Sequence, residues 1–214
     1  MSNPVLLYGK SFANLLGGES SGDTFAVDYL SDTIKFALLD SGHTPNRNTH
    51  EVFSDVSGDE VSGAGYTTGG ATLGSKTITY TAANSWAADW TTATVYAAGD
   101  IVKPTTPNGH VYVCVVGGTS DSGEPSFPTV SGDTVDDNTV TWAELGSGVT
   151  VIDAGDPSFT TATISDIRYG VGYKSGGGNP LLWLVDFADG PFSVSSGTFT
   201  WNISANGIYY FATP

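Results

Sequence analysis

Residues 86–145 read WAADWTTATVYAAGDIVKPTTPNGHVYVCVVGGTSDSGEPSFPTVSGDTVDDNTVTWAEL, and this stretch decides how the rest of the chain is divided. It holds three of the five tryptophans, Trp86, Trp90 and Trp142, with further aromatic residues between them. Because aromatic side chains bury a large area each, this density indicates a core that belongs to the stretch itself. The sequence therefore predicts a small β module here.

Strand-like runs stand on both sides of this module, at residues 76–81 and 149–152. Both are rich in β-branched residues, which favour strands. A module between two such runs is typical of an insertion at the tip of a hairpin. We therefore expect three parts: an N-terminal arm (residues 1–23), a discontinuous host β domain (residues 24–84 plus 149–214) and the inserted aromatic-rich β module (residues 85–148).

Composition favours an all-β fold. The 214 residues include 28 glycines, and only 14% of them are charged, against about 25% in ordinary domains. Many glycines together with many threonines and serines indicate short strands joined by tight turns. The pattern along the chain predicts an antiparallel β-sandwich or barrel of about eight strands with one short helix.

The host domain carries the firmest strand patterns. Residues 33–39 alternate apolar and other side chains, as a half-buried strand does, and residues 25–29 indicate a further strand. Residues 160–173 predict one long strand. Residues 181–187 are apolar at nearly every position, which predicts a central strand covered on both faces. Residues 50–56 predict the short helix, N-capped by Thr49.

The arm is apolar at residues 5–8 and 12–16, and the second run is suited to one or two helical turns. A glycine-rich stretch follows at residues 17–22 and ends any regular pattern. An apolar segment of this kind either packs back on its own domain or docks on a neighbouring subunit, and the sequence leaves both open.

Charge limits the partners. The formal net charge is −15, which repels phosphate backbones and argues against nucleic-acid binding. No apolar run approaches the roughly 18 residues of a membrane span, and no secretion signal is evident, so we expect no membrane association. Cys114 is the single cysteine, so no internal disulfide forms, and its strand pattern predicts a buried apolar role.

No catalytic or cofactor motif stands out. The glycine-rich loop at residues 60–70 lacks the lysine and the following helix of a phosphate-binding loop, and a G-x-S-x-G elbow is absent. His43, His50 and His110 do not follow zinc-ligand spacing. We therefore expect no enzymatic activity, no cofactor and no metal centre.

The aromatic residues of the module have two readings. Sugars stack on exposed aromatic rings, and Trp90 is the ring that we expect to be most exposed, because it precedes the first regular strand. Alternatively, a module of this size needs all of its aromatic residues for its own core. The tentative glycan-contact residues are Trp90, Tyr96, Tyr112 and Trp142.

A weak cation site is a further candidate, at the acidic loop that contains Asp133, Asp136 and Asp137. These carboxylates lie close together in sequence, but they lack the alternating acids, central glycine and distal glutamate of a calcium loop.

Several host segments carry a resemblance: SDTIKFALL (31–39), HEVFSDV (50–56), EVSGAGYTTGGATL (60–73), IRYGVGYK (167–174) and LLWLVDF (181–187). In order and spacing they are similar to a family of tailed-bacteriophage virion proteins. The resemblance implies a viral structural protein, made in the host bacterial cytoplasm and located in the virion. It implies a capsid decoration protein on the outer head surface, a homotrimer that binds the major capsid protein. A neck or tail accessory protein is the alternative.

The module resembles something different. Residues 95–102, 110–114 and 140–142 look like a short module of phage tail and fibre proteins, and more distantly like chitin-binding modules. This second resemblance implies a module that projects outward from the particle. Its alternative function is adhesion to surface glycans.

Overall fold

The computed structural model describes residues 5–16, 25–82, 85 and 87–213. Strands make up 46% of the chain and helices 6%, so the predicted all-β class is confirmed. Strand pairing is mostly antiparallel, and a short pair between residues 88–89 and 102–103 is parallel. The chain divides into two compact units: Met1–Thr77 with Asp153–Ile208, and Ile78–Ile152 with Tyr209–Pro214.

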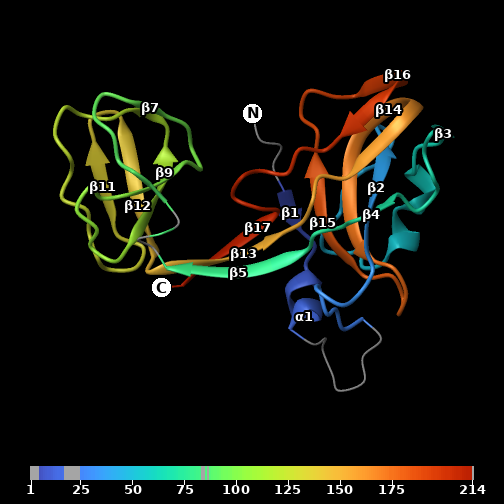
Figure 1. Ribbon diagram of the computed structural model, residues 1–214, viewed down its shortest axis with the longest axis horizontal. Coiled ribbons are helices and arrows are strands. Elements are labelled where there is room, and N and C mark those ends of the chain that lie inside the picture. The colour runs from blue at the N-terminus through green and yellow to red at the C-terminus, as the bar shows by residue number, and fades with distance from the viewer. Residues whose placement is uncertain (1–4, 17–24, 83–84, 86, 214) are drawn as a thin grey trace. The chain divides into compact units, whose positions relative to one another are not determined.

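The first unit is built on a seven-stranded sheet (Figure 1). Its main path runs β1-β15-β14-β2-β4, and β16 and β3 also pair with β14. The strands are β1 (Val5–Leu7), β2 (Ile34–Asp40), β3 (Gly63–Ala64), β4 (Ala71–Thr72), β14 (Ser158–Lys174), β15 (Leu181–Asp186) and β16 (Phe192–Thr200).

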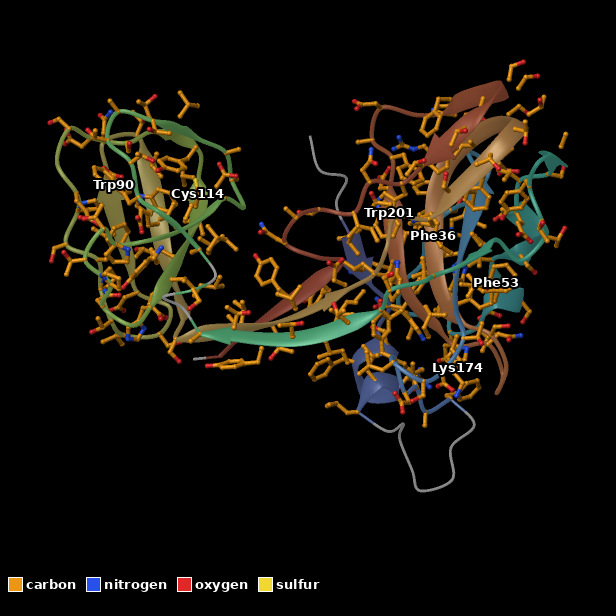
Figure 2. The ribbon with its side chains drawn as sticks, viewed as in Figure 1. Phe36, Phe53, Trp90, Cys114, Lys174 and Trp201 are labelled. Atoms are coloured by element: carbon orange, nitrogen blue, oxygen red, sulfur yellow. The ribbon has the colours of Figure 1, made fainter. Side chains whose placement is uncertain are left out.

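Strand β15 is the centre of this unit, as its unbroken apolar sequence predicts. It lies between β1 and β14, and its first five residues are all buried. Side chains from these strands form a core cluster with Tyr8, Leu39 and Val56. A second contact of the same unit stacks Phe36 on Trp201, with ring centroids 4.5 Å apart (Figure 2).

The described part of the N-terminal arm folds back on its own unit. Strand β1 pairs with β15, and the Tyr8 amide donates to the Leu182 carbonyl over 3.2 Å. Helix α1 (Ser11–Leu15) follows, as the apolar run predicts. Residues 1–4 and 17–23 of the predicted arm lie outside the described residues.

Two predictions for the host domain are wrong. Residues 25–29 form no strand, and the segment is held instead by Lys174, whose ammonium donates to the Ala26 carbonyl. The helix at residues 50–56 is replaced by two 3₁₀ turns, η1 (Phe53–Asp55) and η2 (Ser57–Asp59). The backbone groups that a helix would need are bonded elsewhere. The Glu51 carbonyl accepts from the Leu181 amide, and the Phe53 amide donates to the Asn179 carbonyl.

The glycine-rich loop at residues 60–70 approaches the backbone of β2 closely. At Gly70, φ is +72°, and a Cβ would lie 2.0 Å from the Phe36 carbonyl oxygen. No other residue fits at that distance, so this glycine lets β4 pair closely with β2.

The second unit contains the inserted module. Its larger sheet has the order β11-β12-β9-β8-β6, and β10 pairs with β7 beside it. The strands are β6 (Ala88–Asp89), β7 (Val95–Tyr96), β8 (Ile101–Lys103), β9 (Val111–Val116), β10 (Gly118–Thr119), β11 (Thr134–Asp137) and β12 (Val140–Gly146).

A three-stranded sheet with the order β17-β13-β5 completes this unit. It consists of β5 (Thr77–Ala82), β13 (Gly148–Asp153) and β17 (Tyr209–Thr213). The sequence predicts β5 and β13 as the two strands that flank the insertion. It assigns these two strands and residues 209–213 alike to the host domain. Strand β17 pairs with β13, and the second unit takes in Ile78–Ile152 and Tyr209–Pro214.

Candidate interaction surface

The three-stranded sheet is the most distinctive surface feature of the chain. Strands β5 and β17 contain no charged residue, and Asp153 is the single charge in β13. The remaining residues therefore carry nearly all of the chain's net charge of −15. On β5, Ile78 is 45% exposed and Tyr80 is 60% exposed. An apolar surface within an acidic chain marks a candidate contact site.

The aromatic ring of Tyr80 packs against Gly148 on the neighbouring strand β13. A Cβ on Gly148 would lie 2.6 Å from the Tyr80 hydroxyl oxygen and 2.9 Å from its ring. The glycine therefore makes room for the tyrosine on the neighbouring strand. Tyr80 nevertheless stays 60% exposed, so its ring remains available for contact.

Strand β17 adds further aromatic surface. Tyr209 and Phe211 form an edge-to-face pair with ring centroids 4.9 Å apart, and both side chains are half-buried. Burial also raises the pKa of the Tyr210 phenol, so this ring stays neutral. Strands β5 and β17 are the two outer strands of this sheet.

The aromatic residues proposed for glycan contact lie inside the module. Trp90, Tyr96, Tyr112 and Trp142 are all buried, in one cluster with Val102, Cys114 and Val140. The expectation that Trp90 is exposed is wrong (Figure 2). Trp86 lies outside the described residues. Their burial fits the alternative in which these rings form the core of the module.

Asp137 explains why Trp90 turns inward. Its buried carboxylate accepts hydrogen bonds from both indoles at one oxygen, over 2.8 Å from Trp90 Nε1 and 2.9 Å from Trp142 Nε1. The other oxygen accepts from the Asp121 amide over 2.8 Å. Sequence reasoning missed this contact, because 47 residues separate Trp90 from Asp137.

The tyrosines of this cluster are anchored by their hydroxyl groups. The Tyr96 hydroxyl accepts from the Thr91 amide over 2.9 Å. The Tyr112 hydroxyl donates to the Pro128 carbonyl over 2.6 Å and accepts from Asn108. Burial raises the pKa of Tyr112, which keeps this phenol a donor.

The proposed cation residues are not brought together as ligands. Asp137 is buried and occupied by the indoles, Asp136 accepts from the Thr141 hydroxyl over 2.8 Å, and Asp133 is exposed in a turn. Among the described residues, no three histidine, cysteine, aspartate or glutamate side chains converge on a possible metal position. The weak cation site predicted at this loop is therefore not supported.

The cysteine and the histidines lie in two different regions of the chain. In the module, Cys114 is buried, as predicted, and His110 bonds to Glu144 over 2.7 Å. Burial raises the pKa of the Cys114 thiol, which makes it less reactive. In the first unit, the fold brings the His43 and His50 rings to within 5.5 Å. Their spacing in a loop gives no sequence signal for this.

Comparison with known proteins adds no relative: no family model, no curated protein and no solved structure matches this chain. In the part of the chain that the structure describes, no helix is long and apolar enough to cross a membrane.

Proposed function

We propose that this chain is a non-enzymatic structural protein of a tailed-phage virion, which binds the outer surface of the capsid and associates with copies of itself. The virion assignment rests on the resemblance of the host segments. The observation that supports an assembly role is the uncharged surface of β5, with Ile78 and Tyr80 exposed on a chain of net charge −15.

A second copy of the chain is the occupant that this surface fits best. Two copies that approach through their acidic surfaces repel each other. The three-stranded sheet lowers this repulsion locally, because its strands carry only Asp153. Apolar burial at Ile78 and Tyr80 then favours association, since about 25 cal/mol is gained for each Å² removed from water.

Attachment to the capsid acts by mass action. A protein that binds the assembled shell of the major capsid protein, but not its free subunits, shifts the equilibrium toward the shell. The module then serves as a projecting part of the attached protein. Glycan adhesion has less support, because the four rings that would carry it are buried.

Self-association is tested by sedimentation velocity on the full chain. The double variant Ile78→Ser/Tyr80→Ser is compared with Val130→Ser, a control that removes an apolar side chain 62% exposed in the module. We expect the wild type and the control to form an oligomer, most simply a trimer, and the double variant to be monomeric. A monomeric wild type, or a double variant that still assembles, contradicts the proposal.

The location in the virion is tested on particles. Reconstruction of particles with and without this protein is expected to place it on the outer head surface, at many copies. Particles that lack it are expected to lose DNA at a lower temperature. Density at the neck or tail favours the accessory alternative, and equal heat resistance argues against stabilisation of the shell.

A further inference from the structure

Strand β9 of the module is apolar at every position, but its end is not covered. The sequence VYVCVV (111–116) has the continuous apolar pattern of a strand that is buried on both faces. Strand β15 has the same pattern, and its first five residues are all buried. In β9, by contrast, Val115 is 47% exposed and Val116 is 53% exposed. This part of β9 therefore lacks the cover that its sequence indicates.

The strand register shows which side chains share the uncovered face. Cys114 of β9 lies opposite Trp142 of β12, and both belong to the buried core of the module (Figure 1). Successive side chains of a strand point to opposite faces, so Val113 and Ala143 lie on the other face of this sheet. These two residues are also paired, and Ile101 of β8 extends their row. All three side chains are only half-buried.

A second row on this face ends at a carboxylate. Val116 pairs with Thr141, and Thr141 pairs with Asp136 of β11. The Thr141 hydroxyl donates to Asp136 Oδ1 over 2.8 Å, so these two side chains lie on the same face. The register shifts beside Thr141, where Val115 adds a further exposed side chain to this end of β9. The result is an aliphatic surface with an acidic border.

The charge of the module selects the kind of partner. Residues 85–148 contain eight acidic residues, and Lys103 is the single lysine or arginine among them. Lys103 is already paired with Asp89 over 2.7 Å. Two modules that met through this face would bring like charges together without a free lysine or arginine to offset them. A surface with lysine or arginine around an aliphatic centre is complementary instead.

We infer that this face, with Ile101, Val113 and Val116 at its centre, is a docking surface for a protein segment whose aliphatic side chains are flanked by lysine or arginine. The aliphatic side chains pack on the valines, and the cations lie beside Asp136. This surface is separate from the three-stranded sheet that we propose for contact between copies. The inference is independent of the proposed function.

The test is nuclear magnetic resonance of the full chain, titrated with a synthetic peptide of alternating valine and lysine. We expect the amide signals of Val113, Val116 and Thr141 to shift. Val116→Thr keeps the branched shape of the side chain but adds a hydroxyl, and we expect it to weaken binding several-fold. The matched control is Val130→Thr, at a side chain that is 62% exposed in a turn of the module, and it is expected to bind like the wild type.

Two further peptides separate the apolar and the charged contributions. A serine–lysine peptide and a valine–glutamate peptide are both expected to bind several-fold more weakly than the valine–lysine peptide. Asp136→Asn is expected to weaken binding of the valine–lysine peptide. Equal binding of the serine–lysine peptide overturns the inference, because charge alone would then suffice. Equal binding of the valine–glutamate peptide overturns it as well, because the acidic border would then play no role.

The signals that shift also identify other occupants. Shifts confined to Ile78 and Tyr80 would place the peptide on the three-stranded sheet and would overturn the inference. Shifts at Val113 and Val116 that depend on the concentration of the chain alone would show that this face joins two copies, which also overturns it. Val116→Thr binding as tightly as the wild type has the same consequence.

Discussion

Asp137 is the residue on which the module's core depends. One carboxylate oxygen accepts from two indoles that lie far apart in sequence, and the other accepts from the Asp121 amide. Hydrogen bonds to a charged group are stronger than neutral ones. This residue explains how a module without a disulfide fixes two large rings around one point.

Replacement of Asp137 by alanine is expected to destabilise the second unit by about 3–5 kcal/mol, because two buried indole N–H groups lose their acceptor. Asp137→Asn is expected to cost less, since its amide oxygen still accepts from the indoles while its NH₂ group opposes the Asp121 amide. Urea unfolding followed by tryptophan fluorescence measures both. Asp136→Ala is the control, expected within about 0.5 kcal/mol. Equal effects at both positions would refute the role of Asp137.

We expect the first unit to lose stability at alkaline pH because of Tyr173. Its hydroxyl donates to the Gly69 carbonyl over 2.8 Å, and burial raises its pKa from 10.0 to about 12. A raised folded-state pKa means that the unfolded chain loses this proton first. The stabilisation is therefore complete below pH 10 and is lost as the pH rises toward 12. We expect Tyr173→Phe to flatten the pH dependence of the unfolding free energy in this window, and an unchanged slope would contradict this.

At the scale of elements, the hydrophobic pattern of the sequence predicted the strands whose burial depends on local sequence. The strands β15 and β14 were predictable from local sequence. Burial on both faces leaves a continuous apolar run, as in β15, and burial on one face leaves alternation, as in β14. The helix at residues 50–56 was not, since Glu51 and Phe53 bond to a distant segment. Pairing across long separations overrides local preference in such places.

The candidate site shows the same limit. The sequence predicts β5 and β13 as strands, but not that β17 completes their sheet, so it does not reveal a shared uncharged surface. It also does not predict that His43 and His50 meet, because a loop path has no period. For the aromatic rings of the module, the sequence left two alternatives open, an exposed sugar-binding surface and a buried core. Only the burial seen in the structure decides between them.

Strand β1 protects the edge of β15. Removal of residues 1–9 would leave this strand, apolar at its first five positions, as an exposed edge and would delete the buried Tyr8 side chain. We expect a loss of about 3–5 kcal/mol in the unfolding free energy and aggregation that increases with concentration. Thermal unfolding and light scattering measure these effects. Leu16→Ser, which changes an exposed side chain, is expected to behave like the wild type. A truncated chain that is as stable and as soluble as the wild type would show that β1 contributes little.

For the whole molecule, net charge opposes the association that the uncharged sheet favours. Raising the ionic strength from about 0.01 M to about 0.15 M shortens the Debye length from about 30 Å to about 8 Å. Repulsion between two chains of net charge −15 is then largely screened, while apolar contact is retained. We expect self-association to strengthen several-fold over this range in sedimentation equilibrium. Weaker association at the higher salt would indicate that ion pairs, and not the sheet, hold the copies together.

The position of β17 also sets an order of events during synthesis. Once a ribosome has synthesised β13, it must still add the 55 residues from 154 to 208 before β17 begins. At about 5–20 residues per second, this takes roughly 3–11 s. During this interval the nascent chain carries β5 and β13 without their third strand. Copies on neighbouring ribosomes therefore cannot join through the finished sheet, and assembly is delayed until the first unit has been made.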